Sequence, residues 1–254
     1  MELFDLSNRV AVVTGGNGGI GLGFARGLAK AGASVAVWGR NESKNAAAVD
    51  ELVEMGARAI GVRCDVAETG DVDAAMAETL ERFGKVDSMF ANAGVGSRGT
   101  RFLDMTIDEW RDIFRVNSEG AFLTLQAAAR HMVERGEGGS LVLTASVSSV
   151  MGMPRGEHYA ATKAGAIAIA RGLGVEFGRF GVRANAVVPG WIDTDMTTGL
   201  LASDGFTQRV LPRIPRGRWG LPSDFEGIAV YLASDASAWH TGDVITIDGG
   251  YTVF

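Results

Sequence analysis

The stretch Thr14-Gly15-Gly16-Asn17-Gly18-Gly19-Ile20-Gly21 decides the fold of this 254-residue chain. It joins a short apolar segment, residues 9–14 (RVAVVT), to residues 19–31, where apolar side chains recur at helical spacing. Glycines at such a junction permit a tight turn, let the backbone approach a pyrophosphate, and allow the helix to pack closely on the strand. The spacing is TGxxxGxG, and no Lys-Ser/Thr pair follows, so it is not a P-loop. The turn predicts a dinucleotide at the first strand-to-helix junction.

Outward from this turn, apolar strands alternate with helices. We expect strands at residues 9–14, 34–39, 57–64, 87–91, 139–145, 182–188 and 244–248, and helices at 19–31, 43–56, 69–83, 107–135, 158–180 and 222–234. Continuously apolar strands separated by helices of this length are typical of a parallel sheet covered on both faces. The sequence therefore predicts an α/β fold in which residues 1–254 form a single doubly wound Rossmann-type domain, with a seven-stranded, mostly parallel sheet flanked by helices.

One irregular segment interrupts this alternation. Residues 195–221 are rich in Gly, Pro and Arg, yet they also carry Met196, Leu200, Leu201 and Phe206. Long segments of this kind are more often functional than merely connecting. We expect residues 195–221 to form a lid over a substrate, and their apolar content favours a hydrophobic or acyl-type substrate.

Composition excludes several classes of protein. A net charge of −6 and a pI near 5.2 argue against a nucleic-acid partner. No run of 18 apolar residues occurs, so we expect no membrane span, and the N-terminus has no secretory pattern. The lone Cys64 excludes an internal disulfide, and His131, His158 and His240 share no metal-ligand spacing, so no metal site is expected. These features together predict a cytoplasmic protein.

Three polar residues have a spacing suited to proton transfer. Ser146 follows the strand at 139–145, Tyr159 lies thirteen residues later, and Lys163 four residues after that. A spacing of four places phenol and ammonium on one helix face. We expect the ammonium to lower the pKa of the phenol, which would make Tyr159 a general acid/base, while Ser146 binds the substrate oxygen. A Tyr-Lys pair also occurs on ordinary helices, so the prediction depends on its combination with the glycine turn.

The end of the second strand bears on the cofactor. Gly39-Arg40 stands there, where an acidic residue would bind the ribose 2′-hydroxyl of NAD. A guanidinium instead suits a 2′-phosphate, so NADP(H) is favoured and NAD(H) is the alternative. The competing interpretation of Arg40 is a solvent-facing loop residue. Asp65 follows the third strand, where its residue type and position alone suggest a helix N-cap.

These motifs together resemble those of the classical short-chain dehydrogenase/reductase family. TGxxxGIG, Asn92-Ala93-Gly94, Tyr159-Ala-Ala-Thr-Lys163 and Pro189-Gly190-Trp191-Ile192-Asp193-Thr194 correspond to family motifs, with Ala91 replacing the first asparagine of NNAG. The resemblance spans residues 14 to 194, and Asp248-Gly249-Gly250 extends it. Every catalytic position of the family is filled.

The resemblance implies a set of functional residues. The catalytic ones would be Asn117, Ser146, Tyr159 and Lys163, with the Asn117 backbone anchoring a water in a proton relay. Residues implied to bind the cofactor are Gly15, Asn17, Gly18, Gly19, Ile20, Arg40, Asp65, Val66, Asn92, Ala93, Gly94, Tyr159, Lys163, Pro189, Gly190, Ile192 and Thr194. The resemblance also implies a homotetramer or homodimer paired through the long helices that begin near Ile107 and His158.

The predicted function is hydride transfer between NADP(H) or NAD(H) and a ketone or secondary alcohol, a 3-oxoacyl compound among the candidates. Two alternatives stay open at this stage. One is a dinucleotide-binding regulatory protein without turnover, for which the full Ser-Tyr-Lys set would have no use. The other is a Ser/Lys hydrolase, which is disfavoured because no nucleophile elbow surrounds Ser146. Met151, Met153, Trp191, Met196 and Leu200 are equally consistent with a substrate pocket and with core packing.

Overall fold

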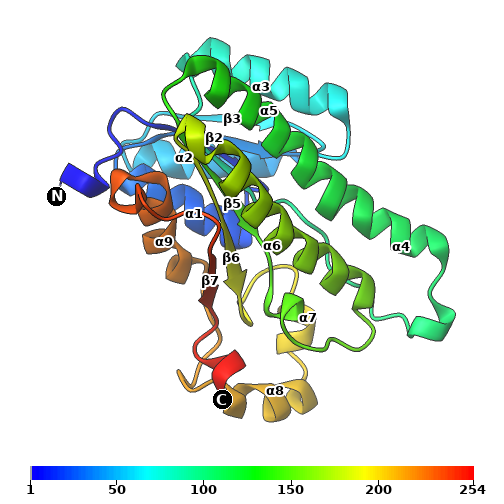
Figure 1. Ribbon diagram of the computed structural model, residues 1–254. Helices are drawn as coiled ribbons and strands as arrows, with labels where there is room; N and C mark the ends of the chain where they lie inside the picture. Colours follow the sequence, from blue (N-terminus) through cyan, green and yellow to red (C-terminus); the bar gives the residue numbers. More distant parts are fainter. Residues whose placement is uncertain (1) are drawn as a thin grey trace.

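A computed structural model describes residues 2–254, and its centre is a seven-stranded sheet in the order β3-β2-β1-β4-β5-β6-β7 (Figure 1). All neighbouring strands pair in parallel. The strands are β1 Val10–Thr14, β2 Ser34–Gly39, β3 Ala59–Arg63, β4 Ser88–Ala91, β5 Gly139–Thr144, β6 Val182–Pro189 and β7 Val244–Ile247. This confirms the predicted Rossmann-type α/β fold.

Helices cover both faces of the sheet. The covering helices are α1 Gly19–Lys30, α2 Glu42–Glu54 and α9 Glu226–Ala233 over one core, and α3 Thr69–Phe83, α5 Gly120–Arg135 and α6 Glu157–Phe177 over the other. Three further helices are α4 Ile107–Phe114, α7 Thr198–Leu201 and α8 Asp204–Val210. In Figure 1, α7 and α8 lie beyond the carboxyl end of β6.

The continuous apolar runs of the strands supply both cores. In β1, Ala11 and Val13 face the core beneath α1, whereas Val12 between them faces the core beneath α5 and α6. Successive side chains of a strand point to opposite faces, so a strand buried on both sides needs apolar residues at every position. Trp38 of β2 is fully buried, and its indole N–H donates to the Thr79 hydroxyl over 3.0 Å.

The predicted helix over residues 107–135 is not one continuous α-helix. It consists of α4, a π-helical turn at Arg115–Glu119, and α5. The wider turn accommodates an extra residue, and Asn117 within it is only 4% exposed. Periodicity alone could not reveal this, because the apolar spacing continues through both α-helices. The irregular segment 195–221 also differs from a plain loop, since it contains α7 and α8.

The strand order reverses between β1 and β4, and this point positions the site. Both strands leave the sheet at the same edge, and their following segments diverge to opposite faces. Ligands of open parallel sheets bind in the crevice outside such a reversal. No helix within residues 2–254 combines the length and the apolar character needed to span a bilayer.

Candidate active site

The glycine turn lies at this crevice, and its backbone is close to its neighbours. Gly15 adopts φ +62°, and its N–H donates to the Trp38 carbonyl over 2.7 Å. A Cβ on Gly15 would lie 3.2 Å from the Ala93 Cα, and one on Gly21 would lie 2.2 Å from the Gly15 carbonyl oxygen. Glycine therefore keeps both the turn and its outer backbone edge accessible, as binding of a pyrophosphate requires.

A cavity of about 300 Å³, here called the central cavity, opens beside this turn. It lies between the turn, the segments after β4 to β6, and the start of α6. The predicted site residues that line it are Gly15, Asn17, Gly18, Gly19, Ile20, Asn92, Ala93, Gly94, Ser146, Tyr159, Lys163, Pro189, Gly190, Ile192 and Thr194. The structure thus brings residues separated by up to 179 positions to one place.

A second cavity, of about 220 Å³, adjoins the first at the ends of β2 and β3 and is called the strand-end cavity. Arg40, Asp65 and Val66 line it, as does Lys44, which also lines the central cavity. The Arg40 guanidinium lies 3.8 Å from the Asp65 carboxylate. Asp65 is not the N-cap of α3, because that position is Glu68; its carboxylate accepts the N–H of Ala67. Lys44 lies in the first turn of α2, and no sequence motif singled it out.

Tyr159 and Lys163 project from the first turns of α6 toward the central cavity. The Lys163 ammonium donates to the Thr144 carbonyl over 2.7 Å and lies 5.8 Å from the centre of the Tyr159 ring. Burial lowers the pKa of Lys163 to about 8. Burial raises the pKa of the Tyr159 phenol, and the Ser146 side chain only partly opposes this.

The prediction that Lys163 lowers the pKa of Tyr159 is therefore wrong for the free protein. Removal from water disfavours the charged form of both groups, and for Tyr159 this desolvation outweighs the opposing hydrogen bond with Ser146. The consequence is a phenol that stays protonated at neutral pH. Such a group is poised to donate a proton.

Two asparagines hold the segments around these side chains. Asn92 Nδ2 donates to the Thr14 carbonyl and Asn92 Oδ1 accepts from the Thr144 hydroxyl, so Asn92 ties β1 to β5. Asn117 lies beneath the cavity and does not line it. Its side chain accepts from Val95 N–H over 2.8 Å and donates to the Val95 carbonyl over 3.0 Å. Asn117 therefore holds the chain after β4 through its side chain.

A third cavity, the apolar cavity, lies on the far side of Tyr159 and Ser146 and has a volume of about 160 Å³. Its remaining lining residues are Gly96, Ser97, Val147, Ser148, Met151, Gly152, Met153, Gly190, Trp191, Met196, Thr197, Leu200 and Tyr251. The five apolar residues singled out from the sequence all belong to this pocket. Ser148 and Tyr251 were missed, because neither belongs to a recognisable motif.

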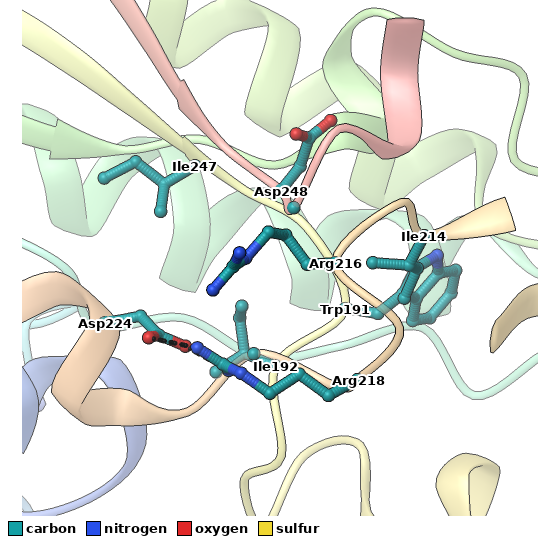
Figure 2. Close-up of a pocket in the computed structure, with 10 residues that line it drawn as sticks. Trp191, Ile192, Ile214, Arg216, Arg218, Asp224, Ile247 and Asp248 are labelled. Carbon is teal, nitrogen blue, oxygen red and sulfur yellow. Dashed lines mark hydrogen bonds and ion pairs between the residues drawn. The ribbon is translucent and has the colours of Figure 1, made fainter. Parts of the chain in front are cut away.

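Charged side chains collect in a separate place. Figure 2 shows a cavity of about 260 Å³, here called the arginine cavity, which Trp191 and Ile192 also line. Asp224 binds Arg218 through two contacts of 2.7 Å, and this pairing lowers the pKa of Asp224 to about 2. The Arg216 side chain extends toward that pair. Over residues 2–254, no three His, Cys, Asp or Glu side chains gather as they would around a metal ion.

Known proteins share this architecture over nearly the whole chain. The family model described as "Enoyl-(Acyl carrier protein) reductase" matches residues 15–252. L-rhamnose 1-dehydrogenase (NAD(P)(+)) of Sphingomonas sp. (strain SKA58) is 39% identical over 98% of each chain. The 3-oxoacyl-(acyl-carrier-protein) reductase of Chlamydia pneumoniae is 34% identical, over 97% of this chain and 98% of its own. A crystal structure of gluconate 5-dehydrogenase from Burkholderia cenocepacia J2315, in complex with NADP and tartrate, is 37% identical with a TM-score of 0.94, covering 100% of this chain and 98% of that one.

The fold and the arrangement of the site define an NAD(P)-dependent oxidoreductase that acts on an alcohol or a ketone. The chain belongs to the classical short-chain dehydrogenase/reductase family. The named substrates of these relatives differ widely, from a sugar to an acyl thioester. Family membership therefore leaves the substrate of this chain to be argued from its own residues.

Proposed function

We propose that this enzyme interconverts a hydrophobic or 3-oxoacyl-type ketone and the corresponding secondary alcohol, with NADP(H) as preferred cofactor and Tyr159 as general acid/base. The observation that carries the proposal is the position of Tyr159 and Ser146 between the central and apolar cavities, which both residues line. A cofactor in the central cavity and a substrate in the apolar cavity would thus meet at the hydroxyls of Tyr159 and Ser146.

In this proposal Ser146 donates a hydrogen bond to the carbonyl oxygen, and Tyr159 transfers its proton to that oxygen. A nicotinamide in the central cavity would supply the hydride to the carbonyl carbon. The C=O π bond breaks as the new C–H and O–H bonds form, and the nicotinamide is oxidised. Lys163 would bind the nicotinamide ribose, and Asn117 would hold the water of a proton relay through its backbone. Tyr159 is protonated at neutral pH in the free protein, which is the form that reduction requires.

The first test is the phenol itself. Tyr159→Phe should lower kcat by at least about a hundredfold, since a positioned general acid contributes roughly that much or more. NADPH binding, followed by fluorescence, should stay within about threefold of the parent enzyme. Turnover of more than a few per cent in a variant that binds NADPH normally would contradict the role of Tyr159.

The cofactor preference is proposed from two cations. Arg40 is exposed at the strand-end cavity, and Lys44 lies between this cavity and the central one. A 2′-phosphate would meet the Arg40 guanidinium, at the position where an acidic residue would bind the ribose 2′-hydroxyl of NAD. Arg40→Ala should weaken NADPH binding about tenfold and leave NADH binding unchanged. Equal affinity for the two cofactors, unaltered in Arg40→Ala, would contradict the preference.

The proposal also covers the domain organisation and the oligomeric state. We infer one domain over residues 1–254, with residues 195–221 as a substrate lid, in a cytoplasmic homodimer or homotetramer. An apolar groove of about 480 Å³ between α5 and α6, together with the 86% exposed Val175, supports pairing through these helices. Light scattering after size exclusion should give two or four times the chain mass. A monomer at micromolar concentration would contradict the pairing.

A further inference from the structure

The arginine cavity has no part in the proposed reaction. Of its ten lining residues, only Trp191 and Ile192 also line the central or the apolar cavity. The others lie within residues 214–224 and 247–249. Its volume of about 260 Å³ exceeds the roughly 150 Å³ of an engineered cavity that binds benzene, so a substituted six-membered ring would fit.

Three of the four charged side chains that line this cavity have partners within the protein. Arg218 and Asp224 bind each other through two contacts of 2.7 Å. The Asp248 carboxylate accepts the N–H groups of Gly250 and Thr252 and the Thr252 hydroxyl. In Figure 2 this carboxylate points away from the Arg218–Asp224 pair. These three charges are therefore satisfied before any ligand binds.

The fourth charged side chain, that of Arg216, has no such partner. Within residues 2–254 its guanidinium forms no ion pair and no hydrogen bond. Arg216 is exposed, so a solute can reach it. Figure 2 shows its head group in the cavity, between Ile247 and the Arg218–Asp224 pair. A guanidinium carries N–H donors in a planar fork that binds a carboxylate through two parallel hydrogen bonds. The cavity therefore contains one accessible and unused carboxylate-binding group.

The backbone that carries Arg216 is fixed against the turn after β7. The Arg216 N–H donates to the Gly249 carbonyl over 3.2 Å, and the Gly217 N–H closes a turn onto the Ile214 carbonyl over 2.8 Å. Gly249 adopts φ +67°, and a Cβ there would lie 3.3 Å from the Arg216 Cβ and 2.8 Å from Ile214 Cγ2. The glycine thus lets Arg216 pack directly on this turn. A fixed backbone lowers the ordering cost that ligand binding must overcome.

The surroundings of Arg216 favour a ligand with one negative charge over a ligand with two. The Arg218 guanidinium, the only other cation of the lining, is already bound to Asp224. The Asp224 carboxylate is charged at neutral pH, because its pairing with Arg218 lowers its pKa to about 2. It would repel a dianion beside Arg216. The three isoleucine side chains of the lining offer apolar contact to a carbon skeleton, which inorganic anions lack. A monocarboxylate with an apolar body therefore matches the cavity better than phosphate does.

We propose that the arginine cavity is a second ligand site, which binds an organic monocarboxylate through the Arg216 guanidinium. The apolar side chains of the lining would pack on the carbon skeleton of the ligand. The site adjoins the proposed reaction site, since Ile192 also lines the central cavity and Trp191 also lines the apolar cavity. The carboxylate belongs either to a separate acid or to the acid end of a substrate, and in both cases Arg216 binds it.

The test measures binding by calorimetry with saturating NADPH present, so that the cofactor site is filled. The probe is benzoate, benzamide is its uncharged counterpart of similar shape, and inorganic phosphate is the compact anion. Benzoate should bind once per chain with a Kd of about 1 mM or tighter. Benzamide should bind at least about tenfold more weakly, because it cannot form the charge-assisted pair with Arg216. Phosphate should also bind at least about tenfold more weakly, because Asp224 repels its second charge.

Arg216→Gln should weaken benzoate binding at least about tenfold and leave benzamide binding unchanged. Arg213→Gln is the matched control, because Arg213 is an exposed arginine of the same segment that does not line the cavity. Its guanidinium lies 4.7 Å from the centre of the Tyr251 ring. Both variants lose one positive charge, so a direct contact predicts that only Arg216→Gln affects benzoate. Normal NADPH binding by both variants establishes that each is folded.

Several results would overturn the carboxylate site. These are benzoate binding no tighter than that of benzamide, phosphate binding tighter than that of benzoate, and an unchanged benzoate affinity in Arg216→Gln. An equal loss of affinity in Arg213→Gln would also overturn it, because the effect would then come from net charge. Absence of turnover for every ketone and alcohol would contradict the proposed function and leave these binding results unaffected.

Initial rates distinguish the two sources of the carboxylate. Competition between benzoate and a ketone substrate, lost in Arg216→Gln, would support the site and identify its ligand as the acid end of a substrate. Benzoate that binds through Arg216 without competing would support the site and identify its ligand as a separate acid.

Discussion

Replacing Gly21 with alanine should destabilise the protein even though alanine is the better helix former. Gly21 is the third residue of α1 and is buried against the glycine turn. Its added Cβ would lie 2.2 Å from the Gly15 carbonyl oxygen and 2.5 Å from Asn92 Nδ2. Normal separations exceed 3 Å, so the turn and the Asn92 side chain would have to move by about 1 Å.

Gly21→Ala changes the free energy of unfolding through two effects of opposite sign. Helix propensity favours alanine over glycine by about 1 kcal/mol. Overpacking against backbone that cannot easily move costs about 1–3 kcal/mol and sometimes more. Because the obstructing atom belongs to Gly15, which is itself held at φ +62°, we expect the upper end of that range. The net free energy of unfolding should therefore fall by about 2 kcal/mol.

Thermal unfolding in the absence of cofactor measures this effect. A loss of about 2 kcal/mol corresponds to a decrease in Tm of roughly 4–8 °C for a protein of this size. Gly70→Ala is the matched control, since Gly70 is exposed in the first turn of α3, away from the proposed subunit interface, and a Cβ there would meet nothing within 4 Å. That variant should match or exceed the parent Tm. NADPH binding should weaken in Gly21→Ala, because the same shift distorts the turn.

An unchanged or raised Tm in Gly21→Ala would refute the reasoning, because it would mean that helix propensity outweighs the contact. A fall of equal size in Gly70→Ala would also refute it, since the loss would then come from replacing a helical glycine in general. Only the opposite signs of the two variants support close approach as the reason for glycine at position 21.

Three further predictions concern buried groups. The pKa of Lys163 is about 8 in the free protein, so this side chain is charged below pH 8 and neutral above it. The value of kcat/KM for ketone reduction should therefore fall above pH 8, and a constant value up to pH 10 would contradict this. Cys64 is 1% exposed, and burial raises the pKa of its thiol to about 12. A thiol reagent at pH 8 should therefore modify Cys64 only after the protein unfolds, and rapid reaction of the folded protein would contradict its burial. The Asp87 carboxylate is 3% exposed, accepts the Val10 N–H and pairs with Arg135. Asp87→Ala should therefore lower the free energy of unfolding by about 3–5 kcal/mol, and an unchanged urea midpoint would contradict this.

Local patterns in the sequence were sufficient for the architecture. The continuous apolar runs and the helical spacing between them predict every strand and the helices that cover the sheet, with boundaries that differ by at most four residues. The long segment 107–135 is the exception. The π-helical turn contains Asn117, whose side chain hydrogen-bonds to the backbone of Val95. Sequence periodicity contains no information about that partner.

The features of the site likewise divide into those that the sequence predicts and those that it does not. The intervals between Ser146, Tyr159 and Lys163 follow from one strand end and one helix turn, so the sequence was enough to place them together. The protonation of Tyr159 was not predictable, because it depends on how completely the surrounding elements exclude water.

The sequence by itself determined the sheet, the glycine turn and the candidate catalytic residues, because each rests on spacing within a few turns of chain. Only the tertiary structure decided the character of the apolar cavity. Met151, Met196 and Tyr251 come from segments far apart in the sequence, and they meet because parallel strands all end at one edge of the sheet.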